Sequence, residues 1–322
     1  MALPGGAPMT IRATARGRFV RCITVVGAVI ASACGEVGEE TLEPVEAPPA
    51  GEAAIADPAS FEGSEYATDA DMVAHGERLA SVLACGSCHL PDYRGANFGQ
   101  MIPLVDGLWA TNISRTLPEF SDAELERLLR EGVHPAREIY LMPSKQSQWL
   151  GDRDMAALLA YLRTIPPTGE ATPPPPMGFE EAVTGRLPDD YWRTAPEGAP
   201  RAYHNAAEEA EYFAENAPAD YGPQLARGRL VALTVCTICH GAALDGVGEP
   251  AGDMQAVLDY GDAGARRLLR EGLDRRGDLV PPTWIPEEAG TDHAFPALTD
   301  GEVAAVVAYV RRLAAERYAA GG

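Results

Sequence analysis

The chain has 322 residues and carries 47 acidic against 26 basic side chains, a formal net charge of −21. This balance argues against a nucleic-acid-binding protein, which needs a basic surface to contact phosphates. No apolar run approaches the roughly 20 residues of an ordinary membrane-spanning helix, which excludes a multi-pass membrane protein. The length suggests two domains.

The first 33 residues have the pattern of an export signal. Four arginines and no acidic residue precede an apolar stretch from Ile23 to Ala33. A charged start followed by an apolar run too short to span a bilayer is typical of a secretory signal peptide. The stretch ends in Ala-Ser-Ala-Cys34, which resembles a bacterial lipobox. We therefore predict a lipoprotein-type signal peptide over residues 1–33 and a lipid on Cys34; plain cleavage nearby and an uncleaved anchor are the alternatives.

Residues 34–65 follow as an acidic, Pro- and Ala-rich segment. A chain of this composition cannot bury enough apolar surface to fold, so it reads as a tether. It would lift the folded part away from a membrane. We expect a periplasmic protein that is held at a bacterial membrane through its lipid anchor.

After the tether, the sequence contains two copies of one pattern of motifs. Amphipathic segments at 71–83 and 224–233 predict a helix at the start of each half. Three strings then recur in the same order: Cys-x-x-Cys-His at 85–89 and 236–240, Leu-Leu-Arg-Glu-Gly at 128–132 and 268–272, and Ala-Tyr-Leu/Val-Arg at 160–163 and 308–311. Such recurrence indicates an internal duplication. We place one domain at 66–166 and the other at 221–318.

Each half is predicted to be all-α, with about three main helices. Capping boxes begin the helices after Ser121 and Thr299, and Gly132 is a natural C-cap. Strand-like alternation is nearly absent. Between the halves, residues 167–220 form a Pro-rich interdomain segment. Because this segment also carries many aromatic side chains, we expect it to wrap over one or both domains.

Cys-x-x-Cys-His is the attachment signature of c-type haem. On one helical turn two thiols can add to the two vinyl groups of a porphyrin, and the adjacent His then reaches the iron. The pattern assigns thioether bonds to Cys85, Cys88, Cys236 and Cys239, and proximal iron ligands to His89 and His240. The alternatives are a zinc site, two disulfides or a thioredoxin-like redox pair. Two covalently bound haem c groups are the favoured interpretation.

The distal ligands are expected to differ between the halves. Met142 lies in a Pro-containing loop before the last helix of the first half, the expected place of a Met ligand. Met101 and Met155 are its rivals, and Met155 reads as helix core. The equivalent loop of the second half has no Met.

For the second half, three options stay open. His293 could give a bis-His iron, Met254 could bind from an unusual place, or the iron could be open. Because a Met ligand raises the reduction potential, bis-His ligation would place the second haem below the first. Electrons would then pass from the second haem to the first and on to a partner.

The order helix, Cys-x-x-Cys-His, loop, helix, Met-Pro loop, helix resembles the class I cytochrome c fold. The first half is similar to the cytochrome c domains of bacterial multihaem subunits that serve alcohol, aldehyde and gluconate dehydrogenases. The matching strings are Thr-Asn-Ile-Ser at 111–114, Arg-Glu-Gly at 130–132, Leu-Met-Pro at 141–143 and Ala-Leu-Leu-Ala-Tyr-Leu-Arg at 157–163. The resemblance implies two tandem domains, each around a covalent haem, with Met142 as distal ligand in the first. Those subunits usually carry three domains and this chain carries two, so their specific partner is not carried over.

The leading functional hypothesis is electron transfer between a periplasmic donor, such as a dehydrogenase, and a respiratory acceptor cytochrome or oxidase. Such a carrier needs redox protein partners and no acid–base residues, and the sequence offers no convincing catalytic constellation. Its acidic surface favours a basic partner. The alternative is a dihaem oxidoreductase or peroxidase with an open coordination position at the second haem.

Overall fold

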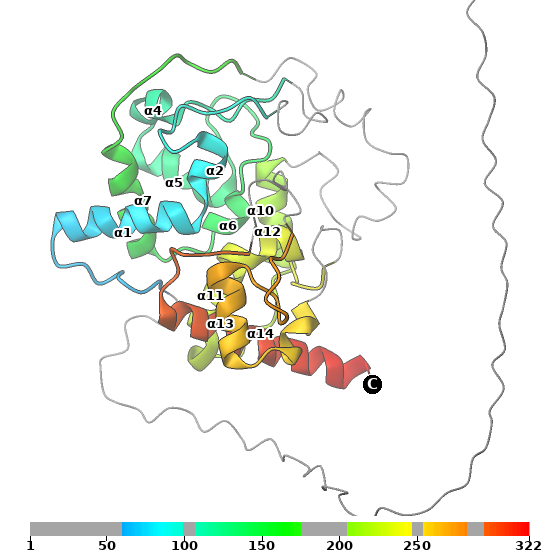
Figure 1. Cartoon of the computed structure of the whole chain (residues 1–322). Coiled ribbons are helices and arrows are strands. Elements are labelled where there is room, and N and C mark those ends of the chain that lie inside the picture. Colours follow the sequence, from blue (N-terminus) through cyan, green and yellow to red (C-terminus); the bar gives the residue numbers. More distant parts are fainter. Residues whose placement is uncertain (1–59, 99–106, 175–204, 247–253, 282–292, 322) are drawn as a thin grey trace, which may run out of the picture. The chain divides into compact units, whose positions relative to one another are not determined.

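The computed structural model describes residues 60–98, 107–174, 205–246, 254–281 and 293–321. Within these ranges the regular structure is helical, and β pairing is limited to isolated bridges (Figure 1). This confirms the predicted all-α class. Across the same ranges, no helix combines the length and the apolar character needed to cross a membrane. The predicted signal peptide, Cys34 and most of the predicted tether lie outside the described residues.

The described helices of the first half lie between Asp69 and Arg163. In chain order they are α1 (Asp69–Val82), α2 (Cys85–His89), α4 (Ile113–Thr116), the 3-10 turn η2 (Leu117–Glu119), α5 (Asp122–Glu131), α6 (Ser144–Ser147) and α7 (Asp152–Arg163). The three main helices expected from the sequence are α1, α5 and α7.

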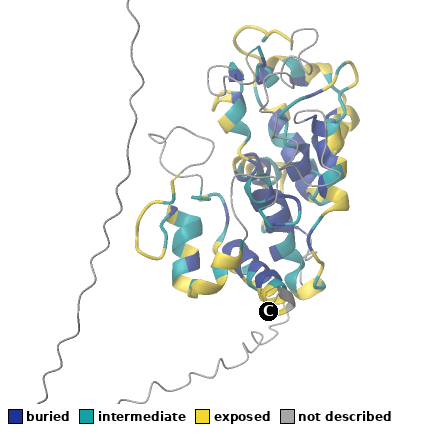
Figure 2. Ribbon diagram, turned by 90° about the vertical axis from the view of Figure 1, so that its right-hand side faces the viewer, coloured by how far each residue is buried: buried dark blue, intermediate teal, exposed yellow. Residues whose placement is uncertain are grey.

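The second half repeats this order after one additional helix. The elements are α10 (Ala206–Glu215), η3 (Pro223–Leu225), α11 (Ala226–Val231), the π-helical turn η4 (Ala232–Cys236), α12 (Thr237–His240), η5 (Met254–Asp259), α13 (Asp262–Glu271) and α14 (Asp300–Gly321). Both halves belong to the same compact unit of the chain. Figure 2 shows the buried residues on the inner faces of these helices and the exposed residues along their outer edges.

The first and last helices of each half cross at a glycine. A Cβ atom added to Gly76 of α1 would lie 1.9 Å from the carbonyl oxygen of Ala157 in α7. A Cβ added to Gly228 of α11 would lie 2.1 Å from the carbonyl oxygen of Ala305 in α14. Both crossings bring backbone against backbone, which no residue with a side chain allows. The same close approach at equivalent places supports the duplication.

Arginines in the repeated strings join the helices of each half. Arg130 at the end of α5 donates to the carbonyl oxygen of Leu150, at 2.6 Å, just before α7 begins. Arg270 at the end of α13 donates to the carbonyl oxygen of Leu298 in the same way. The Leu-Leu-Arg-Glu-Gly string recurs because each half needs this link from its middle helix to the entry of its last helix.

The second repeated arginine makes the reciprocal link. Arg163 at the end of α7 binds the carboxylate of Asp122, the first residue of α5, at 2.7 Å. Arg311 in α14 binds Asp262, the first residue of α13. Each carboxylate also sits at a helix N-terminus, where negative charge is favourable.

The predicted helix ends are confirmed. Ser121 and Glu124 form a capping box at the start of α5, and Thr299 and Glu302 exchange the same hydrogen bonds at the start of α14. Gly132 ends α5 with φ of 69°. This left-handed conformation explains the glycine, because other residues adopt it only with strain.

Residues 60–64, placed in the tether by the sequence, are instead a packed strap. Phe61 is 1% exposed, and its backbone N–H donates to Asp154 Oδ2 at 3.0 Å. The next backbone N–H, of Glu62, donates to Glu302 Oε1 at 2.9 Å. Asp154 and Glu302 occupy the same position, the third residue, in α7 and α14. The strap therefore binds equivalent carboxylates of both halves, and the predicted tether extends too far toward the C-terminus.

Both of these carboxylates are fully buried, and α1 supplies a partner for each. His75 Nε2 lies 2.7 Å from Asp154 Oδ1, and Arg78 Nη1 lies 3.0 Å from Glu302 Oε2. Buried charges are stable only when they are paired and hydrogen-bonded in this way. The α1 helix of the first half thus contacts the last helix of both halves.

We expect Gly76→Ala to destabilise the protein by about 1–3 kcal/mol or more, because the new methyl group must push α1 away from α7. Urea unfolding followed by far-UV circular dichroism measures this loss. Gly264→Ala is the matched control, since Gly264 lies inside α13 and an added Cβ would meet only Tyr260 at 3.4 Å. It should cost nothing and can gain up to about 1 kcal/mol of helix propensity. Equal losses in both variants would contradict the crossing as the cause.

Candidate functional site

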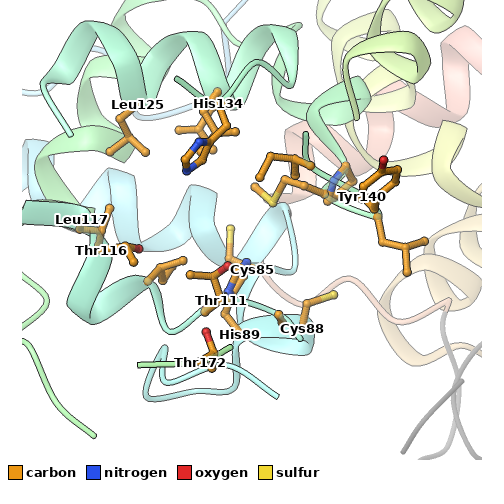
Figure 3. A pocket seen from close by; sticks show the side chains of 18 of the residues that line it. Cys85, Cys88, His89, Thr111, Thr116, Leu117, Leu125, His134, Tyr140 and Thr172 are labelled. Carbon is orange, nitrogen blue, oxygen red and sulfur yellow. Dashed lines mark hydrogen bonds between the residues drawn. The ribbon is translucent and has the colours of Figure 1, made fainter. Parts of the chain in front are cut away.

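The first Cys-x-x-Cys-His string forms a short helix of its own. The α1 helix ends at Val82, and Ala84 adopts a left-handed conformation with φ of 53°. This turn starts α2 at Cys85 in a new direction. Within α2, Cys85 and Cys88 are three residues apart and therefore share one face. The close-up in Figure 3 shows both thiols and His89 at one side of a cavity.

The cavity has a volume of about 510 Å³ and a mostly apolar lining. Its walls come from α2, from the η2 and α5 region, from the loop that carries Met142 and from α7. Apolar side chains that contribute include Leu83, Phe98, Leu108, Trp109, Ile113, Leu117, Phe120, Leu125, Leu128, Leu129, Leu158 and Leu162. A large, flat, hydrophobic group such as a porphyrin suits this lining.

His89 is fixed in the tautomer that an iron ligand needs. Its Nδ1–H donates to the carbonyl oxygen of Thr111 at 2.7 Å. Because a carbonyl oxygen only accepts, Nδ1 carries the proton and Nε2 keeps its lone pair for a metal. Burial lowers the pKa of His89, which also favours the neutral ring.

The buried thiols do not suit thiolate chemistry. Burial raises the pKa of Cys85 to about 12 and also raises the pKa of Cys88. Thiols in such surroundings stay protonated, whereas a redox pair or a zinc site needs thiolates. Within the described ranges the cysteines form no disulfide, and no three His, Cys, Asp or Glu side chains gather into a metal-binding group.

Met142 lines the same cavity and follows Leu141, whose backbone is left-handed with φ of 59°. Its sulfur-bearing side chain is partly buried against the core. Met155 is 1% exposed inside α7 and does not line the cavity, in agreement with its interpretation as helix core. Met101, the other rival, lies outside the described residues.

His134 lines the cavity, whereas its sequence position, two residues after Gly132, indicates only a solvated or packed side chain. It lies across the cavity from His89 (Figure 3), with its ring edge-on to Phe120 at 5.2 Å between centroids. Its Nδ1 accepts the backbone N–H of Ala136 at 3.0 Å. Burial lowers the pKa of His134. His134 belongs to no recognisable haem-binding motif. The turn of the backbone after Gly132 places it at the cavity.

The start of the interdomain segment covers one side of the first cavity. Asn112 is 1% exposed, and its Nδ2 donates to the carbonyl oxygens of Thr168 and Glu170, both at 2.8 Å. Thr172 Oγ1 accepts the backbone N–H of Asn112 at 3.0 Å. Thr172 and Pro173 then line the cavity. The prediction that this segment wraps over a domain is thus confirmed for residues 167–174.

The second Cys-x-x-Cys-His string is joined to the preceding helix in a different way. The π-helical turn η4 leads directly from α11 into α12, so the chain is not broken as it is at Ala84. The loop that follows nevertheless has the same form. Left-handed residues occur one, four and six positions after the histidine in both halves: Leu90, Tyr93 and Gly95 after His89, and Gly241, Leu244 and Gly246 after His240.

The second cavity has a volume of about 240 Å³ and lies against α12, η5, α13 and α14. Cys236, Cys239 and His240 line it, and burial raises the pKa of Cys236 to about 12. Two candidate distal ligands, Met254 and His293, line it as well. The ring centroids of His240 and His293 are 6.2 Å apart, with the ring planes at 79°.

Two helical units that each place Cys-x-x-Cys-His in an apolar cavity define a class of protein, the electron-transfer proteins with covalently attached haem. The profile of the Cytochrome c family matches residues 73–166 and 225–314, which together exceed half of the chain. The chain belongs to the cytochrome c family. A search of curated proteins finds no match to it.

The residues present fit the haem that the family implies. When bound, the group supplies a one-electron couple between ferric and ferrous iron. In the first cavity Cys85 and Cys88 would hold it, His89 would present Nε2, and Met142 would supply a thioether sulfur from the loop. The apolar walls would give the group a surrounding of low polarity, which is one means by which a protein sets a reduction potential.

We expect Asn112→Ala to cost about 1–3 kcal/mol of stability, because two carbonyl oxygens beside the first cavity lose their donor. Residues 168–172 should exchange their amide hydrogens faster. Urea unfolding and hydrogen exchange with mass spectrometry measure the two effects. Asn216→Ala is the control: Asn216 also donates to a carbonyl oxygen, that of Tyr212, but it is exposed. Its loss should stay near 0.5 kcal/mol. Unchanged exchange at 168–172 in Asn112→Ala would contradict this role.

Proposed function

We propose that this chain is a dihaem cytochrome c that transfers electrons between redox proteins. Cys85 and Cys88 hold one haem, and Cys236 and Cys239 hold the other. His89 and Met142 bind the first iron, and His240 binds the second. The observation that carries the proposal is the presence of two cavities, each lined by both cysteines, the adjacent histidine and a candidate distal ligand.

His293 is the proposed distal ligand of the second iron. Metal–imidazole bonds are about 2.0 Å long, so two imidazoles on opposite sides of one metal have ring centres roughly 6 Å apart. The centroid separation of 6.2 Å between His240 and His293 agrees with this value. Met254 lines the same cavity, but its helix η5 precedes α13, whereas His293 follows α13 as Met142 follows α5. The order of elements therefore favours His293.

The two ligand sets imply a direction for electron flow. A Met ligand raises the reduction potential, so the His89/Met142 site would lie above the His240/His293 site. Electrons would enter at the second haem and leave from the first. The donor we propose is a periplasmic dehydrogenase, in keeping with the resemblance of the first half, and the acceptor is a respiratory cytochrome or oxidase.

The proposed location is the periplasmic side of a bacterial membrane. The supporting features are the signal-like residues 1–33 and the lipobox-like string that ends in Cys34. Export also agrees with haem attachment, which takes place outside the bacterial cytoplasm. The net charge of −21 favours a partner with a basic docking surface, and salt should weaken that encounter.

Spectroscopy of the purified protein tests the ligand assignment. Intact mass should show two added haem groups, and near-infrared magnetic circular dichroism should show one Met–iron charge-transfer band beside a bis-His signal. Met142→Leu should abolish the Met band and lower the potential of the first haem, because thioether ligation raises it. One haem, or none, overturns the proposal. A high-spin second haem that binds cyanide favours the dihaem oxidoreductase instead.

We expect Cys34→Ser to release the protein from the membrane, because the proposed lipid is attached through that thiol. Cell fractionation with detection of covalent haem measures the shift from the membrane to the periplasmic fraction. Cys22→Ser is the matched control, since Cys22 lies within the proposed signal peptide and is removed with it. Release by both substitutions, or by neither, would contradict lipidation at Cys34.

A further inference from the structure

The helix α10 is an addition to the cytochrome c fold of this chain. It lies between the two regions that match the family profile, 73–166 and 225–314. Its N-terminus is capped by Asn205, whose side chain accepts the backbone N–H groups of Ala207 and Glu208. Its inner face buries Ala206, Glu209, Ala210 and Phe213. Figure 1 shows α10 beside α6, and the two helices are in contact.

The start of α10 holds the chain before Met142. The backbone N–H of Ala206 donates to the carbonyl oxygen of Ile139 at 2.8 Å, and Asn205 pairs with Tyr140 in an isolated β-bridge. Gly132 lies directly beneath the same end of α10, because a Cβ added there would be 2.4 Å from the carbonyl carbon of Ala206. The loop from Gly132 to Tyr140 is thus fixed at both of its ends by the first turn of α10.

The middle of α10 holds the chain after Met142. Lys145 Nζ lies 3.3 Å from Glu209 Oε1 and 4.4 Å from the centre of the Phe213 ring. The two charged side chains are 5% and 9% exposed. Lys145 is the only lysine in the sequence. Buried pairs of this kind are strongly sensitive to the loss of one member, because the other charge is left uncompensated.

The residues between these two contacts have little freedom. All four residues of α6, which starts two positions after Met142, are buried. Ser144 Oγ donates to the carbonyl oxygen of Leu128 at 2.8 Å, and Ser147 Oγ donates to that of Leu129 at 2.5 Å. These bonds tie α6 to α5, while Lys145 ties it to α10. Met142 therefore lies on a segment held on one side by the cytochrome fold and on the other by the added helix.

We propose that α10 positions Met142 as the distal ligand of the first haem, and that Lys145 and Glu209 are the positioning residues. The inference rests on the proposed function, since it takes Met142 to be that ligand. The pair keeps α10 seated on the loop, and the loop keeps the thioether sulfur at the cavity. Neither residue lines the first cavity, so both act through the backbone around Met142.

The test is Glu209→Gln, which keeps the shape of the side chain and removes its charge. We expect the Met–iron charge-transfer band to fall by at least roughly twofold, because Lys145 loses its ion pair with Glu209 and α10 is held less firmly on the loop. The potential of the first haem should fall with it. Residues 139–147 should exchange amide hydrogens faster. The bands and the potential of the second haem should not change.

Two further variants make the result decisive. Glu211→Gln carries the same substitution at an exposed position of α10 and should leave every signal unchanged. The double variant Lys145→Met with Glu209→Leu removes both charges and should restore the band, since apolar residues can replace a buried pair without loss.

Three results would overturn the inference: an unchanged band and unchanged exchange in Glu209→Gln, an equal effect of Glu211→Gln, or a parallel loss of the second haem's signals. A wild-type protein without a Met–iron band would instead refute Met142 as ligand and so the proposed function. In that case the exchange of residues 139–147 still reports whether α10 holds the loop.

Discussion

The close crossing of the first and last helix in each half is the constraint on which the remaining structure depends. At Gly76 and again at Gly228, one helix backbone lies against another with no room for a side chain. Once that contact is made, the direction in which the chain leaves the first helix is set. The cysteine pair therefore emerges beside a cavity that the last helix also lines. The repeated arginines then close each half by linking its middle helix to its last one.

The two halves have diverged on this shared frame. The first has a left-handed break before its cysteines and a cavity of about 510 Å³, whereas the second has a continuous π-helical turn and a cavity of about 240 Å³. The lining of the first cavity includes the thioether of Met142, and the lining of the second includes the imidazole of His293. The proposed consequence is two irons of different reduction potential in one chain. This difference would set the direction of electron transfer without a conformational change.

Periodicity and motifs predicted much of this architecture because they report local physics. The capping boxes, the C-cap at Gly132 and the core position of Met155 all follow from short-range preferences, and the structure confirms them. The contact between His89 and Thr111 could not be predicted, because the acceptor is a backbone carbonyl with no side-chain signature. The assignments of the iron ligands and the lipid stay predictions, as do the domain boundaries other than the end of the tether.

Features that join distant parts of the chain were missed for a different reason. The strap around Phe61 looks like the end of an acidic linker until the buried carboxylates of Asp154 and Glu302 are seen to need its amides. The helix α10 is short and acidic, and nothing in its own sequence reveals that Glu209 pairs with Lys145. These contacts join residues that are tens to hundreds of positions apart in the sequence. Patterns within a short stretch of sequence do not report which distant residues will pair.

The strap also has a mechanical consequence. A force applied to the chain before residue 60 would act on the folded part through the backbone N–H groups of Phe61 and Glu62. The first is hydrogen-bonded to Asp154 of one half, and the second to Glu302 of the other. Such a force would therefore be shared between α7 and α14 and would not pull the two halves apart. If the chain is anchored through Cys34 as proposed, a force transmitted from the bilayer would act on both halves together and would not separate the two cavities.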